Sequence, residues 1–106
     1  MQWIFLAVAV LTEVVGTLSL KAAAGGATRM YAVVAVGYVA AFSFLSLSLG
    51  AGMALGVAYG IWSAAGVALT ATASKFLFGE PLTLVMTAGI VLIIGGVLLI
   101  EVGAGH

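Results

Sequence analysis

The chemistry of this sequence centres on Glu13, a single carboxylate inside a long apolar stretch. The stretch runs from Trp3 to Leu20 without another charged residue, and Lys21 follows it. A helix of about 20 apolar residues crosses the hydrocarbon core of a membrane, so Glu13 is expected inside such a span. An ionised carboxylate there costs at least about 2.5 kcal/mol, and such residues usually mark an ion or substrate path. A carboxylate with a purely structural role is the alternative.

The helix face around Glu13 is small and smooth and carries no cation. Residues three, four or seven positions away share this face, and Thr17 is the only other polar residue among them. No Lys or Arg interrupts any apolar span. A carboxyl group in apolar surroundings without a positive partner favours its protonated form and ionises when a cation arrives. This alternation is the chemistry of a proton-for-cation exchanger. The face consists of Leu6, Ala9, Val10, Gly16, Thr17 and Leu20.

Aromatic residues on a later apolar span could supply the other wall of a cation site. Trp62 lies near the middle of its span, whereas aromatics that anchor a helix at the membrane surface lie at its ends. Aromatic rings attract an organic cation through their quadrupole. Tyr38 and Phe42, four apart on the preceding span, form a weaker candidate pair, and ordinary packing is the alternative for all these rings. The stripe around Trp62 consists of Tyr59, Trp62, Ser63 and Gly66.

The elements that position these residues follow from the composition. The 106-residue chain is 65% hydrophobic and 6% charged, with a mean hydropathy of +1.40, whereas soluble domains carry about 25% charged residues. We expect an all-α integral membrane protein whose single domain, residues 1–106, holds four transmembrane helices joined by short loops. The predicted spans are about 3–22, 30–49, 54–74 and 82–100, and Pro81 suits the first turn of the last helix. So small a bundle favours oligomerisation.

The charge pattern and the missing residue types exclude several functions. Lys21, Arg29 and Lys75 all fall on one side, which the positive-inside rule places in the cytoplasm. Net charge is zero without a basic patch, so nucleic acid is not an expected partner. Cysteine is absent and His106 is the only histidine, so neither a disulfide nor a metal centre is expected. The chain offers no nucleophile–base pair and no phosphate loop, so we predict neither an enzyme nor a cofactor.

The chain carries several short motifs: Glu13-Val14-Val15-Gly16-Thr17, Gly37-Tyr38 with Phe42, Ala58-Tyr59-Gly60-Ile61-Trp62-Ser63, Phe78-Gly79-Glu80, and the pair Gly89 and Gly96. Together these motifs resemble the small multidrug resistance family over essentially the whole chain. The resemblance implies an antiparallel dimer, either a homodimer or a heterodimer with a paired family member. It also implies proton-coupled export of lipophilic and quaternary ammonium cations across the cell's inner (plasma) membrane.

The resemblance also assigns roles to residues. Glu13 would bind both the proton and the cargo, while Gly89 and Gly96 would lie on the dimer-forming fourth helix. Guanidinium exporters of this family carry a bulky Trp at the place of Gly16, so Gly16-Thr17 favours the quaternary-ammonium branch. Where the family often has Gly-Val-Gly, this chain has 64–66 as Ala-Ala-Gly, which predicts a stiffer third span. The substrate pocket would comprise Tyr59, Trp62, Tyr38, Ser63, Thr17, Gly16 and Phe42.

Two alternatives remain open at this point. The same machinery could export guanidinium or polyamines. A proton-carrying subunit of a membrane rotor ring would also use a lone helix carboxylate, although it needs no aromatic stripe opposite that carboxylate.

Overall fold

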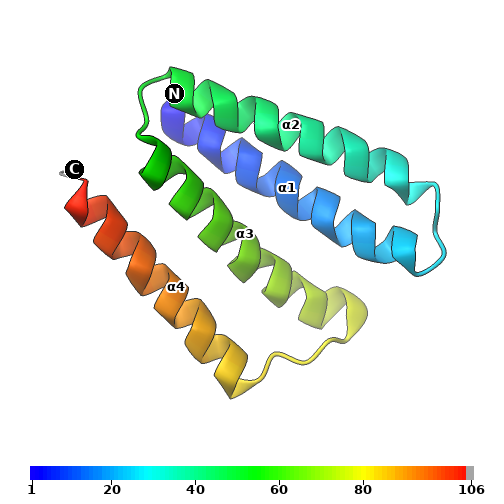
Figure 1. Ribbon diagram of the computed structural model, residues 1–106. Coiled ribbons are helices and arrows are strands. Elements are labelled where there is room, and N and C mark those ends of the chain that lie inside the picture. Colours follow the sequence, from blue (N-terminus) through cyan, green and yellow to red (C-terminus); the bar gives the residue numbers. More distant parts are fainter. Residues whose placement is uncertain (105–106) are drawn as a thin grey trace.

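The computed structural model describes residues 1–104, and His106 lies outside this range. The described chain forms four helices joined by short connections (Figure 1). Each helix is long and apolar enough to cross a membrane, which confirms the predicted all-α transmembrane fold. The helices are α1 (Gln2–Ala24), α2 (Met30–Gly50), α3 (Leu55–Phe78) and α4 (Leu84–Gly103).

A glycine with positive φ lies within two residues of the end of each of the first three helices. Gly79 adopts φ +66° directly after α3, a conformation that costs glycine little. No helix-breaking residue comes between Lys75 and Gly79, so α3 continues to Phe78. The sequence predicted that this helix ends near Lys75. The sequence predicts Pro81 in the first turn of the last helix, but α4 begins only at Leu84. Thr83 caps that helix instead, and its side chain accepts a hydrogen bond from the Met86 backbone N–H at 3.1 Å.

The four helices form a single open layer rather than a closed bundle. The molecule measures 46 × 33 × 15 Å, and a helix with its side chains is about 10–12 Å across, so its smallest dimension holds one layer. The order across the layer is α2, α1, α3, α4 (Figure 1). The helix α2 also contacts α3, whereas α4 contacts only α3. No residue of α4 is buried. Its apolar side chains are therefore available to lipid or to another protein chain.

The closest helix contact lies between α1 and α2 and depends on two glycines. A Cβ added to Gly37 would lie 3.0 Å from the Thr12 carbonyl oxygen and 3.1 Å from the Gly16 Cα. A Cβ on Gly16 would in turn meet the Tyr38 ring at 3.1 Å. Small residues at such crossings let two backbones approach closely in a membrane. This crossing fixes Tyr38 against the helix that carries Glu13.

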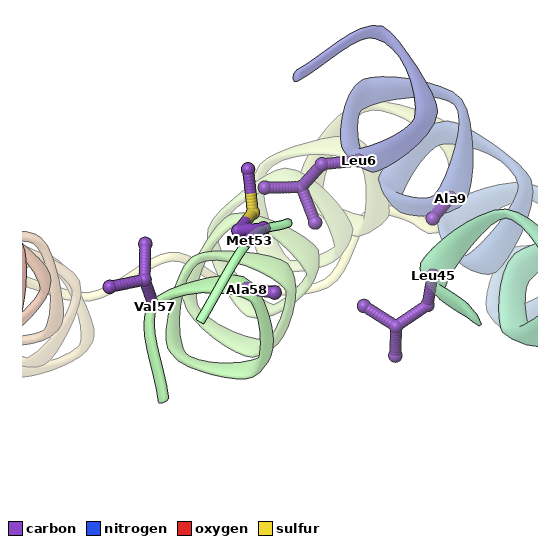
Figure 2. Close-up of a cluster of buried hydrophobic side chains, with 6 residues drawn as sticks. All are labelled: Leu6, Ala9, Leu45, Met53, Val57 and Ala58. Carbon is purple, nitrogen blue, oxygen red and sulfur yellow. The ribbon is translucent and has the colours of Figure 1, made fainter. Parts of the chain in front are cut away.

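A small hydrophobic cluster joins α1, α2 and α3 near the α2–α3 turn (Figure 2). Val57 and Ala58 of α3 are almost completely buried there, and Trp62 packs against the edge of the cluster. At the other end of the layer, Lys21 pairs with Glu80 at 3.3 Å, which connects the end of α1 to the α3–α4 loop. The cluster comprises Leu6, Ala9, Leu45, Met53, Val57 and Ala58.

Candidate functional site

The Glu13 carboxylate lies between α1 and α3 with its two oxygens in different environments. Oε1 accepts a hydrogen bond from the Thr17 hydroxyl at 3.0 Å, one turn along α1. Oε2 is buried and has no hydrogen-bond partner among residues 1–104. Buried polar atoms are normally paired, so the free Oε2 is the atom of this site that can bind a cation.

Two linked hydroxyl groups hold Oε1, the hydrogen-bonded oxygen of Glu13, in position. The Thr17 Oγ1 and Tyr38 hydroxyl oxygens are 2.8 Å apart. A hydroxyl has one proton to donate, and Thr17 donates its proton to Glu13, so Tyr38 donates to Thr17. The ring of Tyr38 occupies the space beside Gly16. Three predicted pocket residues, Gly16, Thr17 and Tyr38, therefore support one carboxylate oxygen.

A cavity of about 470 Å³ opens beside the carboxylate, between α1 and α3. Its size falls within the range of about 300–1,000 Å³ that is usual for small-molecule sites. Val67 on its wall is 51% exposed, so the cavity opens onto a face of the layer. Four of the predicted residues, Glu13, Thr17, Trp62 and Ser63, line it together. Its full lining is Glu13, Thr17, Trp62, Ser63, Gly66, Val67, Thr70 and Ala71.

The aromatic residues gather around Trp62, as a cluster that is partly outside this cavity. The ring of Phe42, from α2, lies 5.3 Å from Trp62, and that of Tyr59 lies 5.6 Å away, centroid to centroid. The Trp62 indole N–H donates to the Ala9 carbonyl oxygen at 3.4 Å, which holds α3 against α1. Only Trp62 of the three rings lines the cavity. Phe42 and Tyr59 are more than half exposed and extend the aromatic surface outward from it.

Several lining residues were not in the pocket predicted from the sequence. Gly66 lies directly opposite the carboxylate, because a Cβ there would be 2.6 Å from Glu13 Oε2. Thr70 contributes a buried hydroxyl that has no partner within residues 1–104. Both continue the helical stripe of Trp62 and Ser63 at spacings of four and seven. Gly66 already lies on the stripe predicted from the sequence, and extending that stripe by one turn would have found Thr70.

The two glycines expected to pack a dimer do not line the Glu13 cavity, although Gly96 lines a neighbouring groove between α3 and α4 together with Ser63 and Val67. Gly89 and Gly96 are on α4, and a Cβ at either position would meet nothing within 4 Å. Val85, Leu92 and Leu99 on the same face are at least 75% exposed. Within one protomer these three side chains are therefore largely unpacked, and the dimer contact remains a prediction.

Comparison with known proteins agrees with this architecture. A family model described as Small Multidrug Resistance protein matches residues 1–93. The multidrug resistance protein EbrB of Bacillus licheniformis is 45% identical over 99 residues, which cover 92% of this chain and 82% of the relative. The multidrug resistance protein mmr of Mycolicibacterium paratuberculosis is 37% identical over the full length of both chains. The multidrug transporter PA4990 of Pseudomonas aeruginosa is 41% identical and covers 99% of this chain and 98% of its own.

These relatives are named as resistance proteins or transporters rather than enzymes, in agreement with the sequence prediction. The family match extends over all of the first three helices and into α4, so it includes both the carboxylate and the aromatic cluster. The chain therefore belongs to the small multidrug resistance family.

Proposed function

We propose that this protein is a proton-coupled antiporter that exports lipophilic and quaternary ammonium cations across the cell's inner membrane. Glu13 binds protons and the cationic cargo in alternation. The names of the relatives support a role in multidrug efflux. The membrane-spanning length of all four helices supports a location in a membrane.

The observation that carries the proposal is the free Oε2 of Glu13 beside a cavity. A buried carboxylate oxygen without a partner needs either a proton or a cation for stability. Lys and Arg in residues 1–104 lie at helix ends or in loops, so no side chain inside the layer supplies a positive charge. Proton and cargo must therefore compete for the same carboxylate, and this competition couples their movements in opposite directions.

The remaining walls favour a lipophilic cation. Trp62 offers an aromatic face, and cation–π attraction needs no hydrogen-bond donor on the cargo. The bulky Trp that the family resemblance associates with guanidinium export has no space at Gly16, because the Tyr38 ring lies 3.1 Å from where a Cβ would be. This packing supports quaternary ammonium cargo over guanidinium.

A second chain is needed to complete the site. A layer 15 Å thick cannot surround a cargo molecule from both sides, and the cavity is open on its Val67 side. An antiparallel partner would close the cavity and bring a second Glu13 to the same chamber. The exposed side chains of Val85, Leu92 and Leu99 on α4, on the same face as Gly89 and Gly96, supply a contact surface for that partner.

The proposal is tested with purified protein in liposomes that carry an imposed proton gradient. We expect tetraphenylphosphonium to accumulate against its own gradient with the wild type and not with Glu13→Gln. Glu101→Gln is the matched control, since Glu101 lies near the end of α4 and does not line the cavity. Proton-driven accumulation by Glu13→Gln, or its loss in Glu101→Gln alone, would contradict the proposal.

A further inference from the structure

The hydroxyl of Thr70 does not make the backbone hydrogen bond that other threonines in these helices make. Thr12 and Thr72 each donate to the carbonyl oxygen four residues before them, at 2.8 Å, which is a common arrangement inside a helix. The buried Thr70 Oγ1 has no hydrogen-bond partner within residues 1–104. Because an unpaired buried hydroxyl is an uncompensated cost, a ligand that pairs with it gains binding energy.

Thr70 is also the hydrogen-bond donor that the Glu13 cavity leaves unused. When Glu13 is ionised, the donors that line this cavity belong to Thr17, Trp62, Ser63 and Thr70. Thr17 already donates to Glu13 Oε1, and Trp62 donates to a backbone carbonyl oxygen of α1. Of the remaining two, only Thr70 has a buried oxygen without a partner within residues 1–104. The cavity therefore holds one buried donor that is free for a ligand.

This donor and the free carboxylate oxygen lie at successive levels of the cavity. Gly66 is level with the carboxylate, because a Cβ on it would be 2.6 Å from Glu13 Oε2. Thr70 is one turn after Gly66 and Trp62 one turn before it, each about 6 Å along the helix axis. A cation at Oε2 therefore has an aromatic wall on one side, and a hydroxyl within reach of a short substituent on the other.

The two oxygens attract different parts of a cargo molecule. An ionised carboxylate only accepts hydrogen bonds, so Glu13 attracts a positive nitrogen and repels an ether or carbonyl oxygen. The Thr70 hydroxyl can donate, so it attracts that same oxygen. A quaternary nitrogen carries no N–H and is held at Oε2 by its charge. No hydrogen bond from the cargo to the carboxylate therefore competes with the one at Thr70.

From this arrangement we propose that Thr70 is a specificity-determining residue that donates its hydroxyl proton to an acceptor oxygen of the cargo. The favoured cargo is a quaternary ammonium cation with an ether or carbonyl oxygen on a short arm from the nitrogen. The nitrogen lies at Glu13 Oε2, the apolar body lies against Trp62, and the arm brings its oxygen to Thr70 Oγ1. This inference rests on the proposed function and narrows its cargo class.

The test uses two quaternary cargoes of similar shape, benzyl(2-methoxyethyl)dimethylammonium and benzylbutyldimethylammonium. They differ by exchange of one ether oxygen for CH₂, and neither carries an N–H. Calorimetric titration gives a selectivity ratio, the affinity for the ether member divided by that for the butyl member. In Thr70→Val, which keeps the shape and removes the hydroxyl, this ratio should fall about fivefold below the wild-type value, the net worth of one hydrogen bond.

Two control variants separate recognition from a general effect on the protein. Thr70→Ser keeps the hydroxyl and should retain the wild-type ratio. Thr72→Val removes a hydroxyl that is already bonded to the Ala68 carbonyl and lies outside the cavity, so it should also retain that ratio. An unchanged ratio in Thr70→Val overturns the assignment, as does an equal loss of affinity for both cargoes. A fall of the ratio in Ser63→Ala instead of Thr70→Val would place the donor at Ser63 and overturn it too.

The wild type provides the outcome if Thr70→Val does not fold. It should bind the two cargoes with affinities within about fivefold of each other, because the hydrogen bond offsets the cost of burying the ether oxygen. A larger deficit for the ether member means that its oxygen is buried without a partner, which overturns the inference without any variant.

A parallel titration with tetraphenylphosphonium keeps the two proposals apart. This cation has no acceptor oxygen, so Thr70→Val should bind it as the wild type does. Failure of the wild type to bind tetraphenylphosphonium counts against the antiporter itself. Normal binding of tetraphenylphosphonium with an unaltered selectivity ratio in Thr70→Val counts against the role of Thr70 alone.

Discussion

Replacement of Gly66 by Ala should displace the Glu13 carboxylate and weaken cargo binding while leaving the helices in place. The new Cβ would lie 2.6 Å from Glu13 Oε2 and 3.3 Å from its Cδ, so the carboxylate must withdraw by about 0.8 Å to reach ordinary contact near 3.4 Å. Glu13 is held in its present position by Thr17, at 3.0 Å from Oε1. The displaced carboxylate loses that hydrogen bond and part of its access to the cavity. The backbone of α3 need not move, because the clash is with a flexible side chain.

The magnitude follows from the bond that is lost. A hydrogen bond to an ionised group is worth about 1.5–3 kcal/mol, and about 1.4 kcal/mol corresponds to tenfold in affinity. We therefore expect Gly66→Ala to bind tetraphenylphosphonium at least about tenfold more weakly. The measurement is calorimetric titration, with circular dichroism to show retained helix content. Gly56→Ala is the matched control, because a Cβ there meets nothing within 4 Å. Affinity within twofold of the wild type for Gly66→Ala would refute the contact on which the reasoning depends.

Three further substitutions test other parts of the site. Trp62→Ala should weaken tetraphenylphosphonium binding by more than about 1 kcal/mol, as expected for cation–π contact; unchanged affinity in the same titration would reduce Trp62 to a packing residue. Tyr38→Phe removes the hydroxyl that donates to Thr17 at 2.8 Å and should lower affinity about fivefold, whereas tighter binding would contradict the proposed hydroxyl chain. Gly37→Ala would press a Cβ against α1 backbone atoms at 3.0–3.2 Å and should destabilise the protein by about 1–3 kcal/mol; unfolding in a denaturing detergent measures this, and wild-type stability would show that the crossing is looser than described.

The fold was predictable because hydrophobicity and helix breakers act locally along the chain. Four apolar spans separated by glycine-rich turns leave little choice in a membrane, where backbone groups must be satisfied within each helix. The end of α3 was harder to place. The charge of Lys75 predicts an end at that residue, but a lysine can extend its charge toward the interface from within a helix. The chain instead leaves the helix only at Gly79, where φ becomes positive.

The candidate site was predictable on each helix and less so between helices. Periodicity places Thr17 beside Glu13 on α1, and the structure shows their hydrogen bond. The contact of Gly66 with the carboxylate depends on how α1 and α3 pack, which periodicity on one helix does not determine. The free hydroxyl of Thr70 has the same origin: its sequence neighbours give no sign that it would lack the backbone bond that Thr72 makes.

The central claim is that one carboxylate holds either a proton or the cargo, and proton release on cargo binding tests it most directly. Tetraphenylphosphonium is added to purified protein in a weakly buffered solution, and the protons released per cation bound are measured from low to high pH. The wild type should release protons when it binds the cation at low pH and progressively fewer as pH rises, while its affinity increases. Glu13→Gln should release none. Cation binding without proton release at any pH, or release that persists in Glu13→Gln, would contradict the claim.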